Sequence, residues 1–205
     1  MLLNNKLFVS TFCHIKNNTI SLNGTPLFSN DVEQFSSFIK SAANHLNTDY
    51  PKFFKMDNLS KLAFLAADVL LKDQQEKSQD IAILLSNRAS SLDTDRKYQA
   101  SISAKENYYP SPSVFVYTLP NICIGEISIK HQLHSESGFF VSQQFDPEPL
   151  HLNSDYLLKN DKAEKVLCGW VDFDDNNYEA FLYLVSENGK FAHSPNVISR
   201  LYHVK

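Results

Sequence analysis

Hydrophobic residues recur along this chain at two spacings, which predict strands and helices in alternation. Residues 7–15 and 19–22 are strand-like, and the Asn-Gly pair at 23–24 has the composition of a tight turn. Apolar residues then lie three and four positions apart, so we expect a helix that begins near Asn30 and Asp31, whose side chains can cap it. The expected buried face of this helix is Val32, Phe35, Phe38, Ile39 and Ala42.

A second helix, a buried strand and an exposed helix are predicted next. Asp57 or Asn58 caps a helix over 59–70, which is apolar on most sides and is therefore expected to be buried. Residues 81–85 form an unbroken apolar run, typical of a strand that helices cover on both faces. The polar run over 93–105 predicts an exposed helix, with acidic residues favourable at its positive end.

Prolines interrupt the chain around residues 114–117, which makes that segment a loop or one short element rather than a central strand. Asn121 can cap the helix that follows, residues 156–158 mark a short helix, and residues 172–177 a turn. Three further strands are predicted, over 139–142, 166–171 and 178–185. This alternation favours an α/β layered fold, and because no linker or repeat divides the sequence we expect one domain over 1–205.

Composition and charge exclude several classes of protein. A chain of 205 residues with 43% apolar and 12% aromatic residues can bury a core. The net charge of -4 argues against nucleic-acid binding, because such proteins neutralise phosphates with clustered Lys and Arg. The apolar run at the N-terminus is too short for a signal peptide, and no run approaches the ~20 residues that span a bilayer. A cytoplasmic protein without a membrane span is expected.

No metal and no cofactor are predicted. The loop at 86–91 lacks the glycines that let backbone N–H groups approach a phosphate. The acidic segment that begins at Asp172 has Asn177 and Tyr183 where a calcium loop needs Gly and Glu, so calcium is rejected. The cysteines are odd in number and far apart, which fits neither a disulfide framework nor a zinc cluster. We therefore expect buried free thiols at Cys13, Cys123 and Cys168.

Three segments in a fixed order carry a resemblance. In residues 109–145 a Pro-Asn pair at 120–121 opens a helix with Gly125, and a short loop and the strand 139–142 follow. Residues 53–71 contain Lys-Met-Asp and then an alanine-rich helix, and a strand, a Ser/Asn-rich loop and an Asp-led helix lie between these two segments. Over roughly residues 53–171 this order resembles the β-ketoacyl-ACP synthases, with the last segment similar to the run that leads to their nucleophile.

The resemblance implies a fold and a mode of association. The implied fold class is α/β, a single half of the thiolase-like fold, with a mixed five-stranded sheet and helices on its faces. The family dimerises through the strand before the nucleophile, which corresponds here to 139–142, so a homo- or hetero-dimer is implied. A lone half is also expected to expose a large apolar face, which normally means a partner or self-association.

The resemblance also locates the position of the nucleophile. In the family a cysteine accepts an acyl group from a carrier-protein thioester. Aligning Val141 and Ser142 with the family's Val-Ser puts Gln143, Gln144 or Phe145 at that position, and none of them can form a thioester. Chain-length-factor subunits, the inactive partners in type II polyketide synthases, carry Gln at the equivalent position. The alternative is that these glutamines merely end a strand.

The family's other catalytic groups lie in the second half of a duplicated fold, which this sequence does not include. His193 and His203 lie in no matching motif and are expected to be exposed or structural. His131 and His134 are expected as charges near a helix C-terminus. Catalytic residues are therefore not assigned in this chain.

The predicted function is that of a 3-oxoacyl-ACP synthase-like pseudoenzyme. It lacks the nucleophilic Cys and the C-terminal catalytic half, and it acts as a partner subunit in carrier-protein-linked fatty acid or polyene-type biosynthesis. Similar short proteins are found in aryl-polyene and flexirubin-type pigment clusters of bacteria. The implied partners are a full-length ketosynthase and acyl carrier protein, of which the acidic carrier is the less favourable for an acidic chain. The alternative is a small acyl-transferring or thioester-hydrolysing enzyme that uses Cys123 or Ser142.

Overall fold

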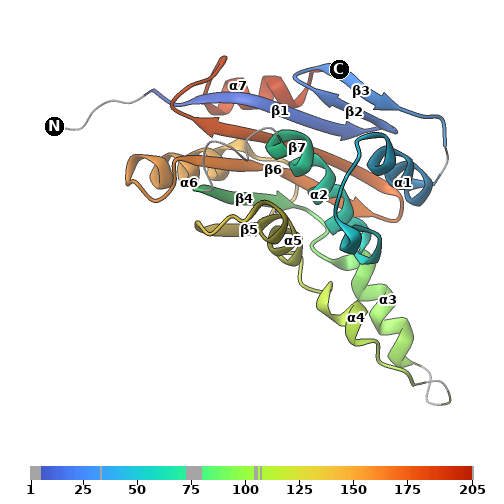
Figure 1. The fold of residues 1–205 in the computed structure, drawn as a ribbon. Helices are drawn as coiled ribbons and strands as arrows, with labels where there is room; N and C mark the ends of the chain where they lie inside the picture. Colours follow the sequence, from blue (N-terminus) through green and yellow to red (C-terminus); the bar gives the residue numbers. More distant parts are fainter. Residues whose placement is uncertain (1–5, 33, 73–79, 104–105, 107, 205) are drawn as a thin grey trace.

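One mixed β-sheet runs through the molecule and carries helices on both faces (Figure 1). The computed structural model describes residues 6–32, 34–72, 80–103, 106 and 108–204. The strands are β1 (Phe8–Lys16), β2 (Thr19–Leu22), β3 (Thr25–Ser29), β4 (Ile81–Asn87), β5 (Ser137–Val141), β6 (Lys165–Asp174), β7 (Asn177–Ser186) and β8 (Phe191–Ala192). The helices are α1 (Phe35–His45), the short 3-10 helix η1 (Pro51–Lys55), α2 (Asn58–Leu71), α3 (Leu92–Ser103), α4 (Pro112–Val116), α5 (Ile122–His131), α6 (Pro147–Lys159) and α7 (Pro195–Tyr202).

The sheet contains eight strands in the described part of the chain, in the order β3-β2-β1-β7-β6-β4-β5 with β8 beside β1. Strands β6, β4 and β5 are parallel, and the remaining pairs are antiparallel. The predicted α/β class and mixed sheet are confirmed. The predicted number of five strands is too low, because β2, β3 and β8 extend the sheet on the side of β1.

Three tight turns explain why the antiparallel side of the sheet is so extensive. Residues 17–18, 23–24 and 175–176 each join neighbouring strands through two residues with positive φ. Such turns match the twist of antiparallel strands, and Asn, Asp and Gly adopt the required backbone conformation with the least strain. The turn chemistry at 23–24 is confirmed, but it connects β2 to β3, a strand that the hydrophobic pattern did not predict.

The two faces of the sheet have separate cores. Helices α1, α2 and α5 cover one face, where the largest buried side chains include Phe38, Phe64 and Leu65. Helices α6 and α7 cover the other face, where Phe181 and Tyr183 are buried. Every residue of β4 is buried, as expected for a strand with neighbours on both sides and helices on both faces.

The observed starts of helices α1 and α2 can be compared with the predicted ones. Of the two predicted caps, Asp57 is the one that caps α2, because its carboxylate accepts a hydrogen bond from the Ser60 N–H at 2.9 Å. Helix α1 begins later than predicted, after Gln34, which makes no capping bond through its side chain. Its predicted apolar face is buried, but Val32 lies before the helix and packs against the core from the preceding segment.

Helices α5 and α6, in the second half of the chain, differ from their predictions. Asn121 occupies the cap position of α5, but its side chain forms no capping hydrogen bond, because its backbone is already helical there. Helix α6 is much longer than the predicted 156–158: Asp146 caps it by accepting from the Glu148 N–H at 3.0 Å, and Pro147 takes the first helical position. The short element predicted around residues 114–117 is found as α4, and the exposed helix predicted over 93–105 is found as α3, with residues 104 and 105 outside the described residues.

Helices α3 and α4 form an arm that extends beyond the sheet (Figure 1). The rings of Tyr98 on α3 and Phe115 on α4 pack with centroids 5.2 Å apart. On the α6 side, α6 itself exposes the large apolar side chains Leu152 and Tyr156, and α7 packs against it. Within the described residues, no helix combines the length and the apolar character that crossing a bilayer requires.

Candidate functional site

The connection from β5 to α6, residues 142–146, lies at the carboxyl end of a parallel strand and at the N-terminus of a helix. This is the edge where open α/β sheets place their ligand sites. The Ser142 N–H donates to the Asn87 carbonyl at 2.8 Å, so the connection starts as a continuation of the β4–β5 pairing. The Ser142 hydroxyl donates to the Gln144 carbonyl at 2.9 Å, which closes a turn before the α6 cap.

The side chains of this connection are amide and aromatic. Gln143 and Gln144 are exposed, whereas Phe145 is half-buried. The Phe145 ring lies 4.5 Å from the ring centre of Tyr202 on α7 and 5.6 Å from that of Phe181 on β7. An amide and a phenyl ring are both unable to attack a thioester. The structure therefore places all three predicted positions together at the end of the strand, and none of them offers a nucleophile.

The thiols lie elsewhere. All three cysteines are free and fully buried, as predicted. Burial raises the pKa of Cys168 to about 12, and it raises the pKa values of Cys13 and Cys123 even further. Because a thiolate, not a thiol, is the nucleophile, burial makes these side chains poor candidates for acyl transfer.

Ser142 is the other alternative nucleophile, and it is half-buried at the start of the connection. Its hydroxyl proton is directed to the Gln144 carbonyl. Among the described residues, no histidine, carboxylate or lysine forms a hydrogen bond with this hydroxyl. A serine nucleophile needs a base within hydrogen-bond distance, so Ser142 lacks the arrangement that would activate it.

Strand β5 forms one edge of the sheet, and within the described chain no strand pairs with its outer side. In parallel pairing, alternate residues of a strand bond to the same neighbour. The Glu136 carbonyl and the Ser142 N–H both bond to β4. The backbone groups of the intervening odd-numbered residues, Ser137, Phe139 and Val141, are consequently directed towards the open edge. Such an edge is a template for pairing with another strand.

Exposed apolar side chains accompany this edge. Val141 on β5 is 60% exposed and Ile129 on α5 is 63% exposed. On and after α4, Phe115, Val116 and Leu119 are exposed as well. Figure 1 shows β5, α5 and α4 following one another along the same side of the molecule. Apolar groups are thus exposed on β5 itself and on the helices that follow along the same side, which is typical of an interaction surface.

Hydrogen bonds within the protein hold the loop 86–91 in place. The Asp172 carboxylate accepts from the backbone N–H groups of Arg88 and Ala89 at 3.1 and 2.9 Å, and the Asn87 side chain bonds to Ser90. The Asp174 carboxylate forms an ion pair with Arg96 on α3. The Asp172 carboxylate thus anchors this loop to β6, and the Asp174 carboxylate anchors α3 to the same strand.

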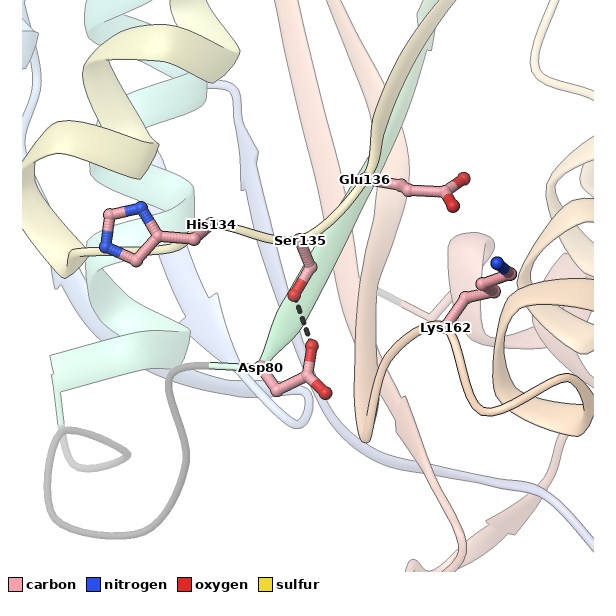
Figure 2. Close-up of a pocket in the computed structure, with 5 residues that line it drawn as sticks. All are labelled: Asp80, His134, Ser135, Glu136 and Lys162. Atoms are coloured by element: carbon pink, nitrogen blue, oxygen red, sulfur yellow. Dashed lines mark hydrogen bonds between the residues drawn. The ribbon is translucent and has the colours of Figure 1, made fainter.

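A shallow pocket of about 470 Å³ lies at the opposite end of the parallel strands (Figure 2). It is lined by Asp80, which precedes β4, by Ser135 and Glu136, which precede β5, and by His134 and Lys162. The Ser135 hydroxyl donates to the Asp80 carboxylate across it. The pocket is wide open to solvent. It lies at the amino ends of β4 and β5, whereas Gln143 and Gln144 follow the carboxyl end of β5, so the two places are separate.

The predictions for the histidines have mixed outcomes. His131 ends α5 as predicted, but it is buried with its Nε2 3.3 Å from a carboxylate oxygen of Asp68. His134 and His203 are exposed. His193 is buried, and this burial, together with the nearby His151, lowers its pKa to about 4 even though Asp155 acts in the opposite direction.

His193 belongs to a polar cluster that sequence reasoning missed. Its Nδ1 lies 3.1 Å from Oδ1 of Asp155, and its Nε2 lies 3.4 Å from the Ser154 hydroxyl. His151 is one helical turn before Asp155, with its Nδ1 3.8 Å from the same Oδ1. The signal for this part of α6 was the Asp-Pro pair at 146–147, which marks a helix start and would have placed His151 and Asp155 on one helical face. Ser154 is fully buried, so the cluster is no exposed hydrolytic triad.

Comparison with solved structures defines the class of fold. Solved structures of ketosynthases and chain length factors match this chain over 88–96% of its length with TM-scores of 0.62–0.67. The chain therefore has the thiolase-like fold of the ketosynthases, which confirms the fold that the resemblance implied. No protein-family model matches the sequence, and no curated protein matches it.

Three particular structures illustrate the likeness. A ketosynthase in complex with its chain length factor from Xenorhabdus doucetiae matches with a TM-score of 0.63 and 16% identity, over 96% of this chain and 90% of that chain. The ishigamide ketosynthase/chain length factor matches with a TM-score of 0.62 and 16% identity, over 88% of this chain and 62% of that chain. A type II polyketide synthase acyl-carrier protein in complex with its ketosynthase bound to the hexaketide matches with a TM-score of 0.67 and 13% identity, over 90% and 63%.

The matched chains differ in length relative to this chain. This chain spans about three fifths of the length of the matched chains in the ishigamide and acyl-carrier-protein structures. It is similar in length to the matched chain of the Xenorhabdus doucetiae complex. At these identities the likeness establishes the fold.

Proposed function

We propose that this protein is a non-catalytic partner subunit of a ketosynthase in carrier-protein-linked assembly of fatty acid or polyene-type acyl chains. The observation that carries the proposal is the β5–α6 connection. It has Gln143, Gln144 and Phe145 at the end of the strand where the resemblance requires a cysteine. Without a thiol at this position the chain cannot hold the growing acyl group as a thioester, so a role in support of another subunit remains.

The open edge of β5 supports an association role. Within the described chain no strand pairs with its outer side, and apolar surface is exposed by Val141 on β5 and by Ile129 on α5. A strand added to this edge would be held by main-chain hydrogen bonds, with the apolar groups contributing hydrophobic contact. One solved structure with this fold, of similar chain length, is a ketosynthase in complex with its chain length factor.

A full-length ketosynthase is the favoured partner. The chain has a net charge of -4, and repulsion between like charges slows the association of two acidic proteins. An acyl carrier protein would therefore be recruited through the ketosynthase subunit rather than through this chain. No observation favours the alternative of an acyl-transferring or thioester-hydrolysing enzyme. Cys123 is buried, and among the described residues no base forms a hydrogen bond with the Ser142 hydroxyl.

The first prediction concerns covalent chemistry. We expect that incubation with an acyl-ACP thioester leaves the mass of this chain unchanged, whereas a ketosynthase with an intact cysteine gains the mass of the acyl group. Intact-protein mass spectrometry makes the measurement. An acyl adduct on this chain that disappears in the Cys123→Ser or Ser142→Ala variant would refute the non-catalytic role and support the alternative.

The second prediction concerns the edge of β5. Val141→Pro removes an N–H that is directed outwards and leaves the pairing with β4 in place, so we expect a folded protein that no longer binds its ketosynthase. The association is measured by native mass spectrometry and sedimentation velocity after co-expression with the full-length ketosynthases of the same organism. The chain alone is measured in parallel, which separates a homodimer from a hetero-complex.

Two control variants give this test its specificity. Val141→Thr keeps the N–H and the branched side chain, and it should bind like the wild type. Leu152→Asp changes a residue that is 64% exposed, close to the 60% of Val141, but lies on α6 rather than at the edge. Loss of binding in the Leu152 variant, or full binding by folded Val141→Pro, would show that β5 is not the interface.

A further inference from the structure

The cluster on α6 brings three ligand atoms together from distant parts of the sequence. His151 and Asp155 lie one turn apart on the same face of the helix. His193 reaches them from the segment between β8 and α7, which is held by a hydrogen bond from the His193 N–H to the Leu7 carbonyl at 2.9 Å. One nitrogen of each imidazole and one carboxylate oxygen all lie within 4.8 Å of one another.

The contacts of His193 are compatible with a neutral imidazole that carries its proton on Nε2 and presents a lone pair to the cluster. The Ser154 hydroxyl has one proton, which it donates to the Leu150 carbonyl at 2.7 Å, as helical serines commonly do. With the hydroxyl proton in that bond, Nε2 of His193 is the donor in its 3.4 Å contact with Ser154. In a neutral imidazole this leaves a lone pair on Nδ1, directed at Oδ1 of Asp155 from 3.1 Å. In this protonation state, either a proton on Nδ1 or a metal ion bound to both atoms stabilises the pair, whereas the other tautomer makes an ordinary Nδ1–H hydrogen bond to Asp155.

His151 also has a buried ring nitrogen that needs a partner. Its Nδ1 is buried and has no hydrogen-bond partner, and it lies 3.8 Å from the same carboxylate oxygen. A buried polar atom without a partner is costly, so an unmade bond of this kind needs an explanation. A single proton could satisfy one of the two imidazoles, whereas a metal ion bound to all three atoms satisfies both.

We propose that His151, Asp155 and His193 form a binding site for one divalent transition-metal ion of the zinc class. Two imidazole nitrogens with one carboxylate oxygen favour Zn²⁺ and its neighbours over Mg²⁺ and Ca²⁺, which prefer oxygen ligands. Ligand atoms about 2.0–2.1 Å from a tetrahedral zinc ion lie about 3.3 Å apart. The separations from Oδ1 of Asp155 to the two imidazole nitrogens, 3.1 and 3.8 Å, bracket that value, and the three atoms together lie within 4.8 Å, so the imidazoles would draw closer together around an ion.

The surroundings match a metal site in two further respects. The second carboxylate oxygen of Asp155 accepts from the Lys159 ammonium at 2.5 Å, and Nε2 of His193 is held by Ser154, so both ligands are oriented by outer contacts. The side chains of His151 and Asp155 are 19% and 20% exposed, which leaves a path for an ion and a fourth position for solvent. The ion would tie α6 to the segment that leads into α7.

The test uses the full chain after removal of metal with EDTA. Zn²⁺ is titrated by isothermal calorimetry, and Co²⁺ is added in parallel because its visible absorption reports four-coordinate geometry. We expect one Zn²⁺ per chain, a four-coordinate Co²⁺ spectrum, and a higher melting temperature with Zn²⁺. His151→Gln is the main variant because this residue is near the surface, and it should lose at least about 10-fold in affinity together with the thermal shift.

The matched control is His203→Gln, which changes an exposed histidine outside the cluster and should bind Zn²⁺ like the wild type. Asp155→Asn is a second variant that removes the charged ligand at similar size, and circular dichroism confirms that each variant is folded. The proposal is overturned if the wild type binds no Zn²⁺ at calorimetric concentrations. It is also overturned if folded His151→Gln and Asp155→Asn bind with wild-type affinity, because the ion would then lie elsewhere and the cluster would be a hydrogen-bond network only.

Discussion

Replacing Gly169 with alanine is expected to lower the free energy of unfolding by more than about 4 kcal/mol, in the range of severe core substitutions. Gly169 lies in β6, between Leu85 of β4 and Leu182 of β7. A Cβ atom at this position would lie 2.1 Å from the Phe181 carbonyl oxygen and 2.8 Å from the Leu182 Cα. Both are backbone atoms of a paired strand, so no change of rotamer relieves the clash, and the sheet itself must move.

The free energy is measured by urea unfolding, with the fluorescence of the buried Trp170 as the signal. Gly125→Ala is the matched control, because an added Cβ there meets nothing within 4 Å on helix α5. Alanine favours a helix over glycine, so this variant should be more stable than the wild type by about 0.5–1 kcal/mol. A Gly169→Ala protein that unfolds at the wild-type urea concentration would contradict the register of β6 and β7 described above.

The second large effect is expected on acidification and centres on Glu179 of β7. Its carboxylate accepts hydrogen bonds from His14 Nε2 at 3.0 Å, from Lys16 Nζ at 2.8 Å and from the Tyr202 hydroxyl at 2.6 Å. Burial alone would raise the pKa of Glu179, but these donors outweigh it and lower the pKa from 4.5 to about 2. The ionised carboxylate thus links β7 to β1 and to α7.

Because the pKa of Glu179 is lower in the folded state, this group stabilises the protein fully above about pH 4.5 and loses that contribution as the pH falls towards 2. The full contribution is about 3 kcal/mol, of which about 2 kcal/mol is lost between pH 6 and pH 3. Urea unfolding of the wild type and of Glu179→Gln at both pH values gives the measurement. The difference between the two proteins should shrink by that amount at pH 3.

Glu164→Gln serves as the control for this experiment, since Glu164 is exposed and should change stability little at either pH. A difference between the wild type and Glu179→Gln that is the same at pH 6 and pH 3 would mean that the carboxylate does not hold its charge through these contacts. In that case the packing of α7 on the sheet would depend on apolar residues such as Ile198 and Leu201 alone.

Strand β5 connects the two features on which the proposed function depends. Its outer backbone groups form the open edge, and its carboxyl end leads directly into Gln143 and Gln144. A subunit paired along this edge would therefore lie close to Gln143 and Gln144, which under the proposed function stand in place of a ketosynthase's cysteine. This proximity is a physical reason why a non-catalytic lobe could influence the acyl chain of a partner.

Some elements of this fold could be predicted from the sequence and others could not. The buried strand β4 and the cap at Asp57 were predicted because each depends on residues within a few positions of one another. Helix α6 was predicted over only a fraction of its length, because prolines at its start obscured the helical period of its apolar residues. Strand β3 and helix α7 were not predicted, since short elements with few apolar residues give a weak periodic signal.

The amino-acid sequence by itself determined the alternation of strands and helices, the burial of α2 and β4, and the absence of a cysteine from residues 142–146, because these are properties of residue types and local spacing. Only the tertiary structure decided that β5 is the edge of the sheet among the described residues, and that His193 meets His151 and Asp155 on α6. These contacts join residues far apart in the sequence. Their positions follow from how the helices pack on the twisted sheet, which no local pattern encodes.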